Sequence, residues 1–447
     1  MRTINMKYIF FFPFLSFFLV YNVSMQAQQR VLDLKSCLEI GLENNYSLRV
    51  SRNDEQISKN NVTLANAGYL PILDVSGSSQ NVLNSTDTKV RATGETNSES
   101  TAFDQTFNVG LNLNWTIFDG FKMTANYERL KELEKQGEIN TRLAIEDFIA
   151  DFTAEYYNNI QQKIRLKNFH YAVSLSKERL RIVEARYTIG DFSRLDLQQA
   201  RVDFNADSSS YMKQQERLQT SHIRLNELMA YKDVNRIIAT SDSIIDVNTL
   251  LDFDELWEST LRTNASILKA ERNNALAELD LKNVYSRNYP YVRLSSGYGY
   301  TLNNYGTGVN SHRNNLGFNA GITVGFNIFD GNRKRERTNA NIAIANARLR
   351  QQELEQSLRA DINNLWQAYC NNIQMLKLER ENLVAAKENH DIARERYLLG
   401  DLSGIAMREA QKSLLDAEER ILTAEYNTKL CEISLLQISG RVVEYVE

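Results

Sequence analysis

An internal duplication constrains this chain more than any other feature of its sequence. Four motifs occur twice in the same order, 210 to 219 residues apart. The pairs are Leu42–Leu48 with Leu261–Ile267, Pro71 with Pro290, Ile117–Gly120 with Ile328–Gly331, and Arg186–Ser193 with Arg396–Ser403. This period far exceeds that of solenoid repeats, so the 447-residue chain contains one domain-sized unit twice.

The duplication divides the chain into parts with predicted bounds. Residues 1–27 are interpreted as a signal peptide, because Arg2 and Lys7 precede an apolar run from Tyr8 to Tyr21 and small or polar residues follow. That run is shorter than the about 20 residues of a membrane-spanning helix, and an uncleaved anchor is the alternative. The first repeat is expected at 28–231, a linker at 232–253 and the second repeat at 254–447.

Each repeat is predicted to contain shorter helices, two strands and a long helical hairpin. The strands are expected at about 72–82, 106–118, 291–302 and 316–329, and the hairpins at 120–231 and 331–440. No Gly or Pro occurs between Asn332 and Leu399, so this stretch can form one helix about 100 Å long at about 1.5 Å per residue.

The last helix shows the spacing of a coiled coil, because apolar and small residues alternate at intervals of three and four. These residues are Leu414, Ala417, Ile421, Ala424, Thr428, Cys431, Leu435 and Ile438. Its counterpart in the first repeat has large apolar residues at every seventh position, namely Phe204, Tyr211, Leu218 and Leu225. Both stripes are expected to pack against neighbouring helices.

Two segments alternate strictly between apolar and polar residues. From Thr106 to Phe118 every second residue is apolar and those between are Asn, Thr or Gly, and Leu316 to Ile328 has nearly the same pattern. A period of two gives a strand one apolar and one polar face. A half-buried sheet of a water-soluble protein is the alternative. The alternation outlasts the common strand of about 5–6 residues, however, and a nearly uncharged polar face favours membrane-crossing strands around a lumen.

Four such strands in one chain cannot close around a pore. An open sheet edge in lipid would leave N–H and C=O groups without partners, so several chains are expected to contribute to one barrel. The segments Asn84–Gln105 and Asn303–Asn315 are rich in Asn, Ser, Thr and Gly, and they are expected to be exposed outer loops.

With these repeated motifs, the chain resembles the TolC family of outer-membrane efflux proteins over nearly all of the sequence after the signal peptide. The resemblance rests on the tandem duplication, the paired prolines, the Arg-Tyr-x-x-Gly turns and the strand-ending residues Phe118, Asp119, Gly120, Phe329, Asp330 and Gly331. It implies a mainly helical protomer with membrane β structure, three copies of which form a twelve-stranded β-barrel continuous with a long α-helical tunnel. It also implies the outer membrane of a Gram-negative bacterium, with the helical part in the periplasm.

The resemblance further implies the partners of such a channel: a homotrimer in outer-membrane lipid, a periplasmic membrane-fusion adaptor and an inner-membrane transporter. The adaptor is expected to dock at the turns between the long helices, at Arg186, Tyr187, Gly190, Asp191, Ser193, Arg396, Tyr397, Gly400, Asp401 and Ser403. These residue types also suit helix caps, with Gly in the left-handed region and Asp or Ser at the next helix start, so capping alone is the alternative.

The resemblance also suggests residues that close the tunnel near these turns. By its distance from the turn glycine, Asp196 matches an acidic gate residue, and Tyr397 matches the residue that donates a hydrogen bond to it. Leu402 stands where a basic residue can add a second link, and Ala406 is the counterpart of Asp196, so Glu409 is a further candidate for an acidic ring. A solvated acid on a helix face is the alternative interpretation.

Catalytic, cofactor and metal motifs are not found in the sequence. The histidines are scattered, and there is no His-Glu-x-x-His, Gly-x-Ser-x-Gly or phosphate-loop pattern. A net charge of −4 gives no support for nucleic-acid binding. We therefore expect no enzyme but a passive gated duct for small molecules or polypeptides. The alternative is a secreted trimeric coiled-coil structural or adhesive protein without a pore.

Overall fold

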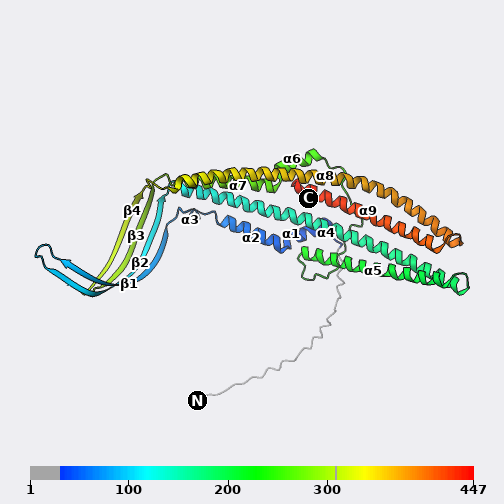
Figure 1. Ribbon diagram of the computed structural model, residues 1–447, viewed down its shortest axis with the longest axis horizontal. Coiled ribbons are helices and arrows are strands. Elements are labelled where there is room, and N and C mark those ends of the chain that lie inside the picture. Colours follow the sequence, from blue (N-terminus) through cyan, green and yellow to red (C-terminus); the bar gives the residue numbers. More distant parts are fainter. Residues whose placement is uncertain (1–30, 308–309, 447) are drawn as a thin grey trace, which may run out of the picture.

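The computed structural model describes residues 31–307 and 310–446, and the predicted signal peptide lies outside them. The protomer is elongated, with a four-stranded sheet at one end and long helices that run from it to the other end (Figure 1). The turns of the two long hairpins lie at the end farthest from the sheet (Figure 1). No described helix combines the length and apolar character needed to span a bilayer.

Both repeats follow the same order of elements, except that the first has an additional short helix, α3, before its strands. The first contains α1 (Leu34–Asn44), α2 (Tyr46–Asn60), α3 (Leu64–Ala67), β1 (Ile72–Lys89), β2 (Thr96–Phe118), α4 (Lys122–Thr188) and α5 (Arg194–Leu228). The second contains α6 (Phe253–Thr263), α7 (Ala265–Ser286), β3 (Tyr291–Asn304), β4 (His312–Gly325), α8 (Asn332–Leu399) and α9 (Gly404–Ile438), followed by the 3-10 helix η1 (Val442–Tyr445). Helices α4 and α8 have 67 and 68 residues, the length that the sequence predicts.

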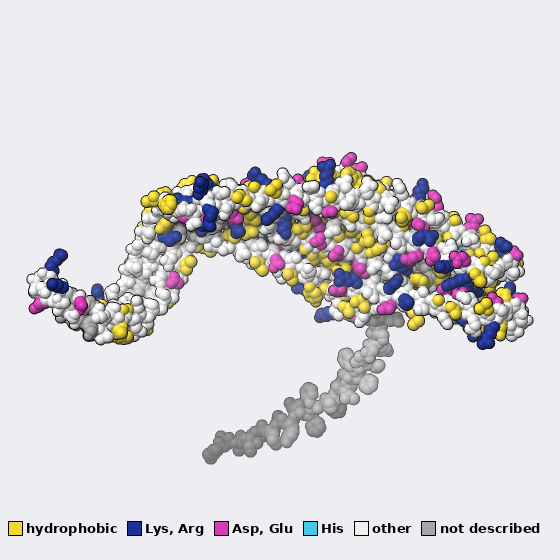
Figure 2. Space-filling view, viewed as in Figure 1, with side chains coloured by type: hydrophobic (Ala, Val, Ile, Leu, Met, Phe, Trp, Pro, Cys, Tyr) yellow, Lys and Arg dark blue, Asp and Glu magenta, His cyan; other side chains and the backbone are white. Residues whose placement is uncertain are grey.

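The sheet joins the two repeats through antiparallel pairing in the order β1-β2-β3-β4. Leu111 lies opposite both Val75 and Tyr298, which places apolar side chains together on one face. On the other face Asn112 donates hydrogen bonds to Asp74 and Ser76. Figure 2 shows charged side chains over the helical body and at the far end of the β1–β2 hairpin, with few over the sheet between them. The sheet therefore has the apolar and polar faces that the alternation predicts.

The prediction that Asn84–Gln105 is an outer loop was wrong. Strand β1 continues to Lys89 and β2 begins at Thr96, so most of this segment is a two-stranded arm beyond the end of β3. An irregularity between Asn84 and Thr86, with Thr101 at φ 64°, interrupts the pairing. The sequence of this arm is polar at almost every position, so the period of two that marks strands with one apolar face is missing.

Strand β4 ends at Gly325, before the predicted end at 329. Gly325 pairs with Tyr291, the first residue of β3, and the preceding Pro290 has no N–H to donate. Among the described residues, the segment after Gly325 therefore has no strand to pair with. Phe326, Ile328 and Phe329 are all exposed.

The main hydrophobic core lies about midway along the helices. Phe152, Tyr156 and Ile160 of α4 pack there with Leu38 of α1 and Leu225 of α5. The connection between α5 and α6 crosses this region, and Leu32 forms a parallel bridge to Thr240 within it. A second cluster around Leu256, Ile362, Tyr369 and Leu435 packs α6 and α8 against α9.

The coiled-coil stripes are only partly where the sequence places them. In α9, Leu414, Ala417, Ala424, Thr428 and Leu435 are buried as expected. In α5 the stripe of Phe204, Tyr211 and Leu218 is only half-buried. The fully buried positions at the same spacing carry Ala200, Asp207, Gln214 and Ser221. The seam between α4 and α5 is thus largely polar, which hydrophobic periodicity alone does not detect.

A buried ion pair connects the C-terminal segment to the helices. Lys429 Nζ lies 2.7 Å from Glu432 Oε1, and both side chains are almost fully buried. Glu432 also accepts hydrogen bonds from the backbone N–H of Asn248 (2.9 Å) and from the Tyr445 hydroxyl (2.8 Å). The ammonium of Lys429 lies 4.9 Å from the ring centre of Tyr157. This cluster holds the inter-repeat connection and η1 against α9.

Removing the carboxylate of this cluster should destabilise the protein strongly. Glu432→Ala leaves Lys429 buried without a counter-charge, and we expect the free energy of unfolding to fall by about 3–5 kcal/mol. Guanidinium unfolding of the purified protein in detergent, followed by circular dichroism, measures this. Glu444→Ala is the control, because its pair with Arg441 is solvent-accessible and should contribute at most about 1 kcal/mol. Equal effects of the two substitutions would contradict the assignment.

Candidate functional site at the turns of the long hairpins

The two turns are built by the same backbone hydrogen bonds. In the first, Gly190 has φ 84°, its N–H donates to Tyr187 O, and Asp191 N–H donates to Arg186 O. In the second, Gly400 has φ 83°, and the equivalent bonds run from Gly400 to Tyr397 and from Asp401 to Arg396. Glycine adopts this left-handed conformation without the steric cost that a Cβ brings, which explains why both copies carry it.

The start of the second helix is capped in both turns, but more completely in the first. The hydroxyl of Ser193 and that of Ser403 accept hydrogen bonds from the N–H groups of Asp196 and Ala406. Asp196 also accepts bonds from the Ser193 hydroxyl (2.6 Å) and N–H (3.0 Å), and these bonds lower the pKa of its carboxyl group. The alternative interpretation, that these residues cap the helices, therefore agrees with the observed hydrogen bonds.

The tyrosines of the two turns lie in different environments. Tyr187 is 41% exposed, whereas Tyr397 is only 4% exposed and packs with Ala393, Met407 and Ala410. Burial raises the pKa of Tyr397. Its hydroxyl has no hydrogen-bond partner among the described residues. The same motif thus presents an accessible ring at one turn and a buried, unsatisfied hydroxyl at the other.

A groove of about 760 Å³ lies between the two turns and brings most of the predicted residues together. It is lined from both hairpins by Arg186, Asp196, Tyr397, Gly400, Asp401, Ser403 and Glu409, and by apolar residues that include Val183, Phe192, Leu195, Leu402 and Ile405. Tyr187, Gly190, Asp191, Ser193 and Arg396 do not line it. Leu195 and Ile405 are strongly exposed, so the groove presents an apolar surface beside charged side chains of both signs: the acids Asp196, Asp203, Asp401 and Glu409 and the cations Arg179, Arg186 and Arg408.

The gate candidates meet in this groove without forming the predicted bond. Asp196 and Tyr397 both line it, and the negative charge of Asp196 contributes, after burial, to raising the pKa of Tyr397. The carboxylate of Asp196 is engaged by Ser193 instead. Glu409 lies on the same groove and is exposed. The hydrogen bond from Tyr397 to Asp196 stays a hypothesis about the assembled channel.

Two ion pairs at the groove, one buried and one half-buried, were not predicted. Arg179 of α4 pairs with Asp203 of α5, and Arg408 of α9 binds Asp207 of α5 through two hydrogen bonds of 2.7 Å. Desolvation lowers the pKa of Arg179, and one of its terminal nitrogens has no partner. The second pair connects the two hairpins near their turns. A sequence signal existed, since Asp207 occupies the seam of α5 where a coiled coil usually carries an apolar residue.

The strand-to-helix motifs start the long helices. Asp119 accepts a hydrogen bond from the N–H of Met123 (3.0 Å), and Asp330 accepts one from the N–H of Asn332 (2.9 Å). Phe118 packs edge-on against Phe121, whose ring also contacts Tyr289. These residues lie at the other end of the helices from the turns, so their role is to join the sheet to the helical body.

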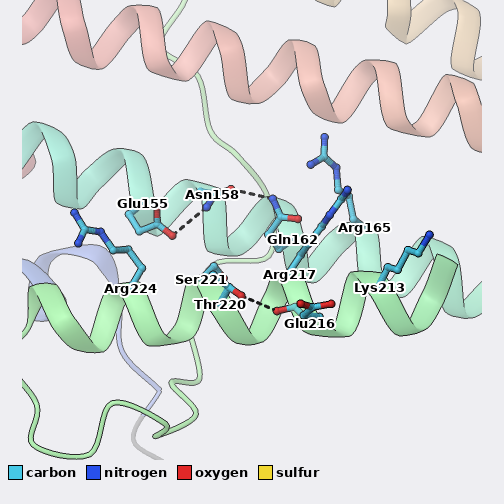
Figure 3. Close-up of a pocket in the computed structure, with 10 residues that line it drawn as sticks. All are labelled: Glu155, Asn158, Gln162, Arg165, Lys213, Glu216, Arg217, Thr220, Ser221 and Arg224. Atoms are coloured by element: carbon cyan, nitrogen blue, oxygen red, sulfur yellow. Dashed lines mark hydrogen bonds between the residues drawn. The ribbon is translucent and has the colours of Figure 1, made fainter. Parts of the chain in front are cut away.

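A second groove, of about 780 Å³, runs between α4 and α5 (Figure 3). It is lined by the cations Arg165, Lys213, Arg217 and Arg224 and the acids Glu155 and Glu216. Arg165 points away from α5 in this view, and it pairs with Glu419 of α9 (Figure 3). Desolvation raises the pKa of Glu155. The other cations spread along the open surface, and this arrangement has no paired nucleophile and base.

In the described ranges 31–307 and 310–446, no group of three or more His, Cys, Asp or Glu side chains is placed to hold a metal ion. The three cysteines are free, and burial raises the pKa of Cys37 to about 12. A buried thiol of this kind stays protonated at neutral pH and is a poor nucleophile.

The fold and the site together define a class of protein: a membrane-anchored channel subunit whose sheet continues into a long helical tunnel. A family profile described as outer membrane efflux protein matches residues 38–230 and 256–441, one match for each repeat. The chain therefore belongs to the outer membrane efflux protein family.

Individual relatives agree with this assignment. The chain is 27% identical to the outer membrane protein TolC of Vibrio cholerae over 170 residues, which are 36% of each protein. It is 21% identical to the outer membrane efflux protein BepC of Brucella suis over 420 residues, 92% of this chain and 85% of BepC. The CmeC outer membrane channel of Campylobacter jejuni has the same fold, with a TM-score of 0.74 at 18% identity over 91% of this chain and 85% of CmeC.

These findings confirm the predicted fold class, a mainly helical, tandem-duplicated TolC-like protomer whose sheet and long helices match those of outer-membrane channels. They confirm the outer-membrane localisation and the function in efflux. The alternative of a coiled-coil adhesive protein without a pore receives no support.

The ion pair between the hairpins should be energetically coupled. In a double-mutant cycle of Arg408→Ala and Asp207→Ala, we expect a coupling of about 1–3 kcal/mol, because the pair is half-buried and doubly hydrogen-bonded. Unfolding of the purified variants in detergent gives the four free energies. The matched control is the pair Arg201–Glu184, which lies on the exposed surface of the first hairpin, and its coupling should be near zero. A coupling near zero for both pairs would refute the link.

Proposed function

We propose that the chain is the outer-membrane subunit of a tripartite export system, in which it acts as a passive gated duct without catalysis. The observation that carries this proposal is the continuity of two structures. A sheet with one apolar and one polar face passes directly into helices of 67 and 68 residues. A trimer joins a pore through the outer membrane to a tunnel that reaches across the periplasm.

The polar face of the sheet supports a duct that does not select its cargo strongly. Its side chains are mostly amides and hydroxyls that bond to one another, as Thr301 does to Asn108 and Asn112 to Ser76. Such groups are already satisfied and present no concentrated charge. The cargo is therefore either small molecules or polypeptides. Gene deletion followed by tests of sensitivity to toxic compounds and metals, and of the secreted proteins, identifies which.

The turns are the proposed docking site for a periplasmic adaptor that connects to an inner-membrane transporter. Three features support this role. The turns lie at the end farthest from the sheet (Figure 1), Tyr187 and Ile189 are exposed there, and the groove between the turns combines apolar surface with charged side chains of both signs. The cap bonds keep these turns rigid, so a partner meets a preformed surface.

The gate is proposed to lie at the same turns, with Asp196, Tyr397 and Glu409 as candidates. The unpartnered hydroxyl of Tyr397 supports this, because a buried donor without an acceptor favours any state that supplies one. The ion pair of Arg408 with Asp207 holds the hairpins together and resists their separation.

Channel activity and gating can be measured together in planar lipid bilayers. The purified protein should give discrete conductance steps, and Arg408→Ala should open more often because one link between the hairpins is lost. Asp196→Ala should also open more often if Asp196 holds the gate. Asp254→Ala, on the distant helix α6, is the control and should behave like the unaltered protein. The absence of any conductance would contradict the channel, and unchanged opening of Asp196→Ala would remove that residue from the gate.

If an adaptor docks at the turns, a substitution there should reduce export in cells without changing conductance in bilayers. Ile189→Asp places a charge on a 79% exposed apolar position, and we expect at least a tenfold loss of export in cells, with conductance in bilayers unchanged. Leu250→Asp, at an exposed apolar position in the inter-repeat connection, should retain export. If Ile189→Asp exports normally, or if Leu250→Asp fails equally, the docking site is not at the turn.

A further inference from the structure

A cluster of basic side chains lies where the sheet passes into helix α8. Four of the first six residues of this helix are cations, namely Arg333, Lys334, Arg335 and Arg337. The one acid among these six residues is Glu336, which pairs with Arg287 of α7 at 2.6 Å. Figure 2 shows Lys and Arg side chains next to hydrophobic ones where the helices leave the sheet. The four cations are called the basic cluster below.

The basic cluster has no anionic partner among the described residues. Lys334, Arg335 and Arg337 are exposed, and their side chains form no ion pair or hydrogen bond with the part of the chain that the structure describes. Arg333 donates one hydrogen bond, to the carbonyl oxygen of Asn327, and its Nε is buried without a partner. The described part of the protomer therefore leaves the positive charge of this cluster unneutralised.

Helix stability does not account for the basic cluster. The N-terminal end of a helix carries a partial positive charge, so cations are unfavourable there. Arg333 and Arg337 also lie four residues apart, where like charges repel. The equivalent start of α4, residues 122–126, carries Lys122 as its one charged side chain and opens a helix of nearly the same length. The cluster thus belongs to the second repeat alone, and its charge points to an anion outside the chain.

The basic cluster lies at the level of the membrane surface. Arg333 follows five residues after Ile328, the last residue of the alternating pattern in the second repeat. The headgroup layer adds about 5–8 Å on each side of the hydrocarbon core, and a helix rises about 1.5 Å per residue, so the first turn of α8 lies among headgroups. Trp115, Phe121 and Tyr289 are exposed near the same junction. Exposed Trp and Tyr side chains are enriched where a protein meets this interface.

We propose that the basic cluster binds the phosphate groups of anionic phospholipids in the periplasmic leaflet of the outer membrane. The N–H groups of arginine match phosphate oxygens, and lysine adds a point charge. Four or more cations directly beside a membrane-crossing segment are typical of proteins that bind anionic lipids, and long side chains can carry their charge to the membrane surface. The proposal rests on the outer-membrane location of the family and is independent of cargo, adaptor and gate.

The arrangement of the cluster suits a lipid anchor. Successive residues of a helix point in directions about 100° apart, so the four cations surround the start of α8 rather than line one face. A bound phosphate supplies the negative charge that both the cations and the first turn of the helix favour. Because α8 runs without interruption from this point to the turns, lipid binding here fixes the depth at which the helix leaves the membrane.

Native mass spectrometry of the purified, delipidated protein in detergent measures how much added lipid it binds. The unaltered protein should bind phosphatidylglycerol more tightly than phosphatidylcholine. Lys334→Gln with Arg335→Gln should weaken phosphatidylglycerol binding by about tenfold or more, because each cation near an anionic lipid surface contributes about a factor of five. The matched control is Arg350→Gln with Lys377→Gln, which removes the same charge from exposed, unpaired positions of α8 farther from the sheet and should bind normally.

The outcomes separate this inference from the channel itself. Conductance in phosphatidylcholine bilayers should be unchanged in both double variants, and Lys334→Arg with Arg335→Lys, which keeps the charge, should bind phosphatidylglycerol like the unaltered protein. Equal binding of the two lipids by the unaltered protein, or an equal loss in the two double variants, overturns the lipid site and leaves the channel intact. Inorganic phosphate at the concentration of the lipid should not displace phosphatidylglycerol; displacement would show a site for free phosphate and overturn the anchor.

Discussion

The need to satisfy backbone N–H and C=O groups in lipid governs this molecule. The sheet has four strands, and its first and last members each carry one edge without a neighbouring strand among the described residues. In water these groups would bind solvent, but in a bilayer they require another strand. Assembly is therefore part of folding for this protein. The exposed residues after β4 belong to the same unsatisfied edge.

The helical body converts this closed barrel into a long tunnel. Helices α4 and α8 run without interruption from the strand ends to the turns. The arrangement of the strands therefore also determines where the turns lie at the far end. The interior of the first hairpin is polar, with Asn159 bonded to Ser221 and Gln214 to Gln162. Near the turns this polar seam ends in the ion pairs of Arg179 and Arg408.

The duplication produced two similar sequences, and equivalent residues of the two copies lie in different environments. Tyr187 is accessible whereas Tyr397 is buried, although both occupy the same place in the same motif. A Cβ on Gly120 would collide with Ser286 O, whereas among the described residues a Cβ on Gly331 would meet only the ring of Phe329. Inside the chain, α4 packs against α7 through polar links such as Arg129 to Asp280 and Gln136 to Asn273.

The sequence alone determined the duplication, the lengths of the helices, the central part of each strand and the membrane location. These follow from short-range rules: periods of two and of seven residues, sparse Gly and Pro, and motifs with fixed spacing. It did not reveal the arm beyond β3, whose polar strands have no apolar face to mark them. It also missed the ion pairs of Arg179 with Asp203 and Arg408 with Asp207, and the burial of Tyr397. Those features depend on which helices lie side by side, and only the tertiary structure decides that because the partners are separated by up to 201 residues.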